Sequence, residues 1–256
     1  MPRIDAVQQS LSRITAIARH NVLLRLRDPG QAISYLALPM ILMIVLKPLY
    51  ERAVPGGATQ IVTGLLVMFS VFAVGIAGST ILAERQWHTW DRLRQTKASS
   101  AEIMAGKVAP IYLLMLVQQT VLLGYGCAVI GMPLPKSWGL IALAIAVWAF
   151  TLLSIGAALA TIARSLSELG VISDVGAMVL SSMAGALVPL SILPAWVQGA
   201  AHFSPGYYAL EMVQAAIAGD GAEVLLQALI LLAIGVAALG YAIYRLARGW
   251  GRTRLL

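Results

Sequence analysis

Residues 84–107 read ERQWHTWDRLRQTKASSAEIMAGK, and this stretch determines how the rest of the chain is interpreted. It is the one long interior segment that is rich in charged and amphipathic residues. The apolar segments on either side run for about twenty residues, the length of a helix that crosses a bilayer. Because charged side chains are costly inside the hydrocarbon layer, we expect residues 84–107 to lie outside the membrane.

The overall composition is that of a helical membrane protein with several spans. Of the 256 residues, 59% are hydrophobic and only 11% are charged, whereas roughly a quarter of the residues of a soluble domain are charged. An outer-membrane barrel would show segments of alternating polarity, about ten residues each. The apolar segments here are continuous, so the predicted fold class is all-α, with one membrane domain over residues 31–244.

Six segments are apolar and long enough to cross the bilayer as helices. They cover approximately residues 31–50, 61–83, 108–131, 137–163, 169–190 and 224–244. Pro39 lies in the middle of the first span, where a proline tends to kink a helix.

The chain outside the spans has three further parts. In residues 1–30, apolar side chains recur at intervals of three and four, which favours an amphipathic interfacial helix over a mobile basic tail. Residues 191–218 are broken by Pro194 and Pro205 and carry several aromatic side chains, which is typical of a re-entrant or interfacial hairpin. Residues 245–256 form a basic tail.

The positive charges predict the orientation of the chain. With six crossings both termini lie on one side, and 15 of the 18 lysine and arginine residues fall on that side; the exceptions are Lys47, Arg52 and Lys136. Because loops rich in Lys and Arg stay in the cytoplasm, we place the termini and residues 84–107 there. The net charge of +7 therefore reflects topology and lipid headgroups, and nucleic-acid binding is a poor second interpretation.

The sequence shows no catalytic centre. His20, His88 and His202 lie on separate segments without ligand spacing, and Cys127 is the only cysteine, so no metal site is expected. There is no Walker motif, so this sequence predicts no nucleotide hydrolysis of its own. Asp174 is an ionisable residue within a span; a structural role, such as pairing with Arg164, is favoured over a proton relay.

Trp87, Trp90 and Arg94 in the polar segment fall at helical spacing. The simplest interpretation is a solvated helical loop, but two tryptophans exposed to the cytosol would form an apolar surface that favours aggregation. Because Trp and Arg are enriched at protein interfaces, docking against another protein is favoured over burial in the lipid interface.

These residues resemble the permease subunit of type 2 ATP-binding-cassette (ABC) exporters. In that family the second span ends in a pattern like ERExGTxExLxxTP, followed about ten residues later by GK. The residues that match are Glu84, Arg85, Thr89, Leu93, Thr96, Gly106 and Lys107, and those that depart are Gln86, His88 and Lys97. A second resemblance lies in Pro189, in the sequence LPAW of residues 193–196 and in SPGYYALE of residues 204–211.

The resemblance implies a membrane subunit that works with a separate ATPase. Residues 84–107 would contain a cytoplasmic coupling helix that fits a cleft on the ATPase, with Glu84, Arg85, Trp87, Thr89, Trp90, Asp91 and Arg92 as its contacts. Residues 191–218 would contain external re-entrant helices, marked by Pro189, Pro194, Pro205 and Glu211. Two permeases, as a homodimer or a related heterodimer, would join two ATPases in the bacterial inner membrane. ATP and Mg would bind the ATPases, and no cofactor is implied for this chain.

The expected function is export of a hydrophobic or amphipathic substrate. Met68, Phe69, Met115, Gln118 and Gln119 are the tentative substrate path, an apolar surface with some hydrogen-bonding groups. The short linker at residues 51–60 favours a drug or lipid over a polysaccharide. Two alternatives stay open: a proton-coupled carrier that uses Asp174, and a membrane assembly or anchoring protein that transports nothing.

Overall fold

The structure is a computed structural model that describes residues 30–86 and 100–248, with residues 12, 14–16, 18, 19, 21 and 22 of the N-terminal region. All the regular elements in these residues are helices. The long ones are α2 (Gly30–Ala53), α3 (Gly57–Gln86), α5 (Ser100–Tyr125), α6 (Trp138–Ile162), α7 (Leu166–Met183) and α10 (Gly221–Ala247). The short ones are the π-helix η1 (Gly126–Ile130), the 3-10 helix η2 (Leu190–Ile192), α8 (Ala195–Ala201) and α9 (Pro205–Ala218).

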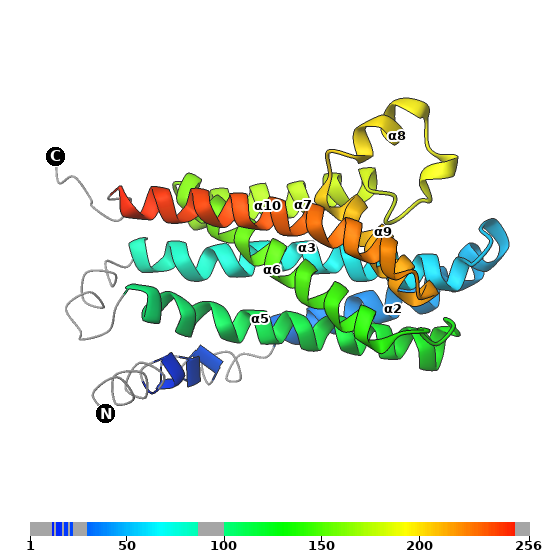
Figure 1. Ribbon diagram of the computed structural model, residues 1–256, viewed down its shortest axis with the longest axis horizontal. Coiled ribbons are helices and arrows are strands. Elements are labelled where there is room, and N and C mark those ends of the chain that lie inside the picture. The colour runs from blue at the N-terminus through cyan, green and yellow to red at the C-terminus, as the bar shows by residue number, and fades with distance from the viewer. Residues whose placement is uncertain are drawn as a thin grey trace.

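The six long helices are each apolar and long enough to cross a membrane. They run along the long axis of the molecule and form one bundle (Figure 1). This confirms the predicted fold class. The predicted amphipathic helix at residues 1–30 lies largely outside the described residues.

The bundle has two distinguishable ends (Figure 1). One end, here called the basic end, holds Gln86, Ser100, Ile162, Leu166 and Ala247. The other, here called the hairpin end, holds the α2–α3 connection and the hairpin formed by α8 and α9.

Helix α3 is the centre of the bundle. Of the residues in its most apolar stretch 83% are buried, against 17% in α2 and 22% in α7. Residues 57–83 contain no charged side chain, so α3 can be surrounded by other helices without burying a charge. Helices α2, α5, α6, α7 and α9 all pack against it.

Small residues bring α3 and α6 close together. A Cβ atom added at Gly156 of α6 would lie 2.7 Å from the carbonyl oxygen of Val74, and one added at Gly78 of α3 would lie 3.0 Å from the carbonyl oxygen of Gly156. Small side chains let helix backbones approach in lipid, where dispersion contacts replace the hydrophobic effect as the driving force. Glycine at these two positions therefore fixes the crossing of α3 and α6.

Hydrogen bonds join α6 to α10 along its length. The Thr151 hydroxyl donates to the carbonyl oxygen of Leu231 at 3.0 Å. At the basic end, Arg245 donates to the carbonyl oxygen of Thr161 at 3.1 Å. Gly235 of α10 packs against the ring of Phe150, where an added Cβ would lie 2.9 Å from ring carbon Cε1.

Two helix boundaries differ from the sequence prediction. Residues 100–107 belong to the polar segment in the sequence, but in the structure they form the first part of α5, because good helix formers such as Ala, Glu and Met occupy these positions. Helix α7 ends at Met183, before the predicted end near residue 190, and Gly185 then takes a φ of 81° that most residues avoid. Helix α2 covers the first predicted span and is continuous through Pro39 and Pro48.

Candidate functional site

A cluster of polar side chains, here called the polar cluster, lies at the hairpin end and consists of Tyr50, Gln60, Thr63 and Gln214. Tyr50 of α2 donates its hydroxyl hydrogen to the carbonyl oxygen of Leu187, and Gln60 Nε2 donates to that of Gly185 at 2.8 Å. These two bonds hold the turn that follows α7. Backbone groups that leave a helix inside an apolar environment need such partners.

The same cluster also ties α9 to α3. Gln214 Nε2 donates to Gln60 Oε1 at 2.9 Å and to the Thr63 hydroxyl oxygen at 3.1 Å. A Cβ added at Gly64 would lie 1.8 Å from the carbonyl oxygen of Ala186, so the turn rests directly on the α3 backbone. The turn after α7 and helix α9 are therefore both anchored to the central helix.

Helix α9 packs against the sides of α3, α6 and α10. Its N-cap, Ser204, is buried; the Ser204 hydroxyl accepts from the amide of Gly206 at 3.2 Å and donates to the carbonyl oxygen of Leu180 at 3.0 Å. Seven residues of α9 are buried: Gly206, Ala209, Leu210, Met212, Val213, Ala216 and Ile217. Trp196 of α8 is 72% exposed, and Phe203, which follows α8, is 90% exposed.

The four residues predicted to mark the re-entrant segment lie at the hairpin. Pro189 directly precedes η2, Pro194 is the N-cap of α8, and Pro205 is the first residue of α9. A proline at a helix start loses no hydrogen bond, because the first amides of a helix have no partner within it. Glu211 lies in the second turn of α9 and is half-buried.

Burial raises the pKa of the Glu211 carboxyl above its ordinary value, and the nearby Glu223 raises that pKa further. Desolvation acts first, because a charged carboxylate loses water contacts at this position. Burial and the charge of Glu211 likewise raise the pKa of the Tyr207 hydroxyl. The hairpin therefore favours a protonated Glu211 over a wider pH range than free solution does.

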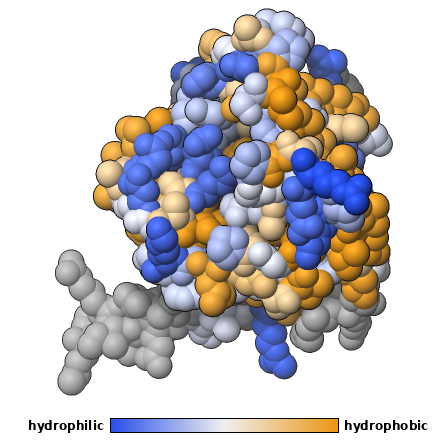
Figure 2. All heavy atoms as spheres, turned by 90° about the vertical axis from the view of Figure 1, so that its right-hand side faces the viewer, coloured by the Kyte–Doolittle hydropathy of each residue, from blue (hydrophilic) through white to orange (hydrophobic). Residues whose placement is uncertain are grey.

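Hydrophilic residues gather on the face of the hairpin end, with hydrophobic residues at its margins (Figure 2). The exposed polar residues of this end include Glu51, Arg52, Lys136, Gln198 and Asp220. Such a face suits the boundary between a bilayer and water.

The residues of the tentative substrate path lie inside the bundle, on α3 and α5. Phe69, Met115, Gln118 and Gln119 are buried, and Met68 is half-buried. Gln118 Nε2 donates to the carbonyl oxygen of Tyr35 on α2 at 3.2 Å. The amide of Gln119 is fully buried, and neither its nitrogen nor its oxygen has a hydrogen-bond partner. A role in transport for these five residues stays a prediction.

The predicted coupling contacts fall mainly outside the described residues. Glu84 and Arg85 are in the last turn of α3, where the structure describes the backbone alone. Trp87, Thr89, Trp90, Asp91 and Arg92 lie outside the described residues.

Asp174 is exposed on α7, and in the described part of the chain it forms no ion pair with Arg164. The Arg164 amide instead donates to Glu168 Oε2 at 2.9 Å. Among the described residues, no group of three or more His, Cys, Asp or Glu side chains converges on a point that could hold a metal ion.

The polar cluster is not evident from the sequence. The signal was present, since Gln60, Thr63 and Gln214 are polar residues in or beside apolar segments. Their partners, however, include main-chain carbonyl groups more than 120 positions away. Hydropathy alone does not reveal which distant carbonyl a glutamine meets.

Six spanning helices and a packed, partly polar hairpin at one end define a multi-pass membrane protein. Comparison with known proteins then gives the family: residues 12–218 match the model of the ABC-2 type transporter family, so the chain belongs to that family. The chain is also 30% identical over 201 residues to the inner membrane transport permease YhhJ of Escherichia coli (strain K12) and to that of Shigella flexneri. These 201 residues are 77% of this chain and 52% of each relative, so the chain spans about half the length of the curated relatives it matches.

Proposed function

We propose that the chain is the membrane-spanning permease subunit of an ATP-driven exporter. The observation that carries this proposal is the family match over residues 12–218, which includes five of the six spanning helices and the whole α8–α9 hairpin. The relatives YhhJ are named as inner membrane transport permeases, which supports a transport role in the bacterial inner membrane.

The energy source is a separate ATPase subunit, present in two copies, which binds ATP and Mg. Two permease copies, identical or closely related, form the membrane part. Support comes from the sequence, which has no Walker motif, and from residues 84–97, which resemble the coupling pattern of the family. The ATPase drives transport only if it binds two conformations of the permease with different affinity.

The substrate is a hydrophobic or amphipathic molecule, drug-like or lipid-like, taken from the cytoplasm or the inner leaflet. The bundle interior supports this class, because most of the described residues that are buried in it are apolar. The large exposed apolar side chains of α2 and α7 offer surfaces to lipid or to a second permease copy; they include Ile41, Val45, Val171 and Met178.

The contact with the ATPase can be tested by changing the tryptophan and aspartate of the coupling segment. We expect the double variant Trp87→Ala, Asp91→Ala to insert normally but to lose co-purification with the ATPase and to lose export. Removing an anchoring Trp at the centre of an interface typically costs 2 kcal/mol or more, which is about a thirtyfold loss of affinity.

Trp196→Ala is the matched control, because Trp196 is exposed on α8 at the hairpin end. This variant should co-purify with the ATPase as the unchanged protein does. If the double variant associates with the ATPase and exports substrate as the unchanged protein does, residues 84–107 are not the docking site.

A further inference from the structure

Three exposed arginine side chains, here called the arginine cluster, lie at the basic end, where α6 and α10 finish. Arg164 follows the end of α6, Arg245 is in the last turn of α10, and Arg248 is the C-cap of α10. Arg245 Nη2 donates to the carbonyl oxygen of Thr161 at 3.1 Å, so the end of α10 rests against the end of α6. Three residues of chain reach at most about 11 Å, so Arg164 starts close to that contact.

One exposed face of α10 changes in character toward this end. Exposed residues recur there at intervals of three and four, which places them on the same side of the helix. In chain order they are Ala237, Gly240, Tyr241, Tyr244, Arg245 and Arg248. The guanidinium carbon Cζ of Arg248 lies 4.5 Å from the centroid of the Tyr244 ring. The order from small apolar to aromatic to cationic matches the passage from acyl chains to lipid headgroups.

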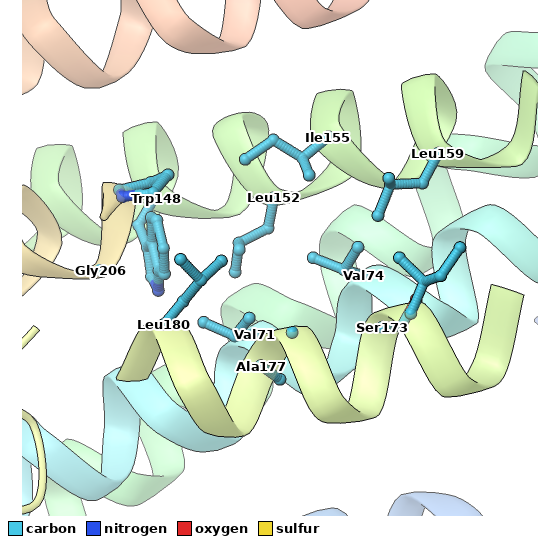
Figure 3. Close-up of a pocket in the computed structure, with 13 residues that line it drawn as sticks. Val71, Val74, Trp148, Leu152, Ile155, Leu159, Ser173, Ala177, Leu180 and Gly206 are labelled. Atoms are coloured by element: carbon cyan, nitrogen blue, oxygen red, sulfur yellow. The ribbon is translucent and has the colours of Figure 1, made fainter. Parts of the chain in front are cut away.

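Helix length places the arginine cluster at a bilayer boundary. Glu223 in the first turn of α10 and Arg245 in its last turn are separated by about 33 Å at the rise of an α-helix, slightly more than the roughly 30 Å of the hydrocarbon core. Leu152, Ile155 and Leu159 of α6 line a small space against α7 (Figure 3). Helix α6 carries no charged side chain along its length, so charge first appears after it ends.

The arginine cluster has hydrogen-bond donors to spare. In the part of the chain that the structure describes, none of its three guanidinium groups pairs with a carboxylate. Glu168, the carboxylate closest in sequence to Arg164, instead accepts from the Arg164 main-chain amide at 2.9 Å. A guanidinium has five N–H donors, and Arg245 uses one of them on Thr161. The planar arginine fork fits two oxygens of a phosphate group.

The surroundings of the arginine cluster favour a lipid over a soluble anion. Ile162 and Ile243 are 50% and 58% exposed beside it, and the small residues Ala237 and Gly240 leave room along α10. A soluble phosphate would use the charges alone, whereas a phospholipid would use the charges and the apolar face together. A zwitterionic headgroup would bring an ammonium group toward three arginines, so like-charge repulsion favours an anionic headgroup.

We propose that the arginine cluster binds the phosphodiester headgroup of an anionic phospholipid. Arg164, Arg245 and Arg248 surround the phosphate, and an acyl chain lies along α10 past Tyr241 and Gly240. The lipid thereby bridges the ends of α6 and α10. Binding belongs to the single chain and requires neither an ATPase nor transport, so this inference stands apart from the proposed function.

The test titrates the full chain, purified in a neutral detergent, with single phospholipids and counts bound lipids by native mass spectrometry. The probes are phosphatidylglycerol and phosphatidylethanolamine with the same palmitoyl and oleoyl chains. We expect phosphatidylglycerol to bind about tenfold more tightly, because its headgroup keeps a net negative charge beside the three arginines. Equal affinities for the two lipids would overturn the proposal.

Two double variants remove the same charge from opposite ends of the bundle. Arg164→Gln with Arg248→Gln breaks no side-chain hydrogen bond of the described residues, so it should fold. We expect its affinity for phosphatidylglycerol to fall about tenfold, with no change for phosphatidylethanolamine. The control, Arg52→Gln with Lys136→Gln, changes two exposed residues of the hairpin end and should bind as the unchanged protein does. An equal fall in both variants would show attraction by net charge alone and would contradict the site.

The headgroup without its acyl chains distinguishes a lipid from a soluble phosphate. Glycerophosphoglycerol in large excess should leave phosphatidylglycerol bound, because it lacks the contact with the apolar face of α10. Displacement by this soluble headgroup would show that the arginine cluster recognises phosphate in solution, which would overturn the assignment to a lipid.

Discussion

Protonation of Glu211 is expected to make the stability of the hairpin depend on pH. Its pKa is raised in the folded protein, chiefly by burial, so the fold favours the protonated carboxyl. For such a group the contribution to stability is complete below the unfolded pKa, ordinarily 4.5, and is lost as pH rises through the folded pKa. We therefore expect the thermal unfolding temperature of the purified chain to fall as pH rises above about 4.5.

Glu211→Gln should remove this part of the pH dependence, because glutamine stays neutral at every pH. Glu223→Gln should reduce it, since Glu223 adds to the shift of Glu211. Gln198→Ala, which removes no titratable group from the exposed helix α8, is the control that should leave the profile unchanged. A Glu211→Gln profile parallel to that of the unchanged protein would contradict the assignment.

Gln214 joins α9 to α3 through a single side-chain amide. Gln214→Leu keeps most of the volume but leaves the Gln60 amide oxygen without its donor. Leaving a buried polar group unpaired costs about 1–3 kcal/mol, and Gln60 is half-buried, so we expect a loss of about 1 kcal/mol in the free energy of unfolding by chemical denaturation. Gln198 is exposed on α8, so Gln198→Leu should change the free energy of unfolding by less than about 0.5 kcal/mol. Equal losses would show that the polar cluster contributes nothing specific.

For individual residues, the sequence predicts the structural position of some but not of others. The sequence predicts that Pro194 and Pro205 interrupt the helical structure, and both lie at helix starts. Trp148 gave no signal, because a tryptophan within an apolar span looks like any other core residue. Its indole N–H is buried without a hydrogen-bond partner, which depends on how other helices pack around α6.

At the scale of elements, the crossing of α3 and α6 depends on Gly156. Gly156→Ala would place a Cβ 2.7 Å from the carbonyl oxygen of Val74 and 3.0 Å from the Ala77 Cβ, so the helices must separate. Overpacking of this kind costs about 1–3 kcal/mol, and we expect this loss of unfolding free energy in denaturant titrations. A Cβ added at Gly139, in the same helix, would have only the Ser137 hydroxyl oxygen within 4 Å, at 3.9 Å. Gly139→Ala should therefore leave the free energy of unfolding close to that of the unchanged protein. If both variants lose the same amount, backbone flexibility rather than helix contact is the cause.

The existence of the six spans followed from hydropathy, but their ends did not. Helix α7 ends early because its last carbonyl groups and the turn after it meet Tyr50, Gln60 and Ser204 from other elements. Helix α5 begins early because nothing in residues 100–107 stops a helix. Apolar length predicts that a segment crosses the bilayer, whereas contacts with neighbouring elements decide where the helix stops.

At the scale of the whole molecule, the distribution of positive charge predicts the orientation. In the described part of the chain the hairpin end carries Lys47, Arg52 and Lys136, and the segments predicted to be cytoplasmic carry Arg19, Lys107, Arg164, Arg245 and Arg248. Most of the predicted excess on that side comes from Arg3, Arg13, Arg25, Arg27, Arg92, Arg94, Lys97, Arg252 and Arg254, which lie outside the described residues, and from Arg85, which is described by its backbone alone. Orientation is therefore a prediction from sequence that labelling can test.

Single cysteines at the two ends would report the orientation directly. In a Cys127→Ala background, we expect Arg248→Cys to react with a membrane-impermeant maleimide only after inner-membrane vesicles are turned cytoplasmic side out. Lys136→Cys should react in intact spheroplasts, because an exposed residue at the hairpin end then faces the external medium. Labelling of both variants after detergent solubilisation controls for access. The reverse pattern would place the hairpin in the cytoplasm, and the ATPase could not then bind residues 84–107 from the cytoplasmic side.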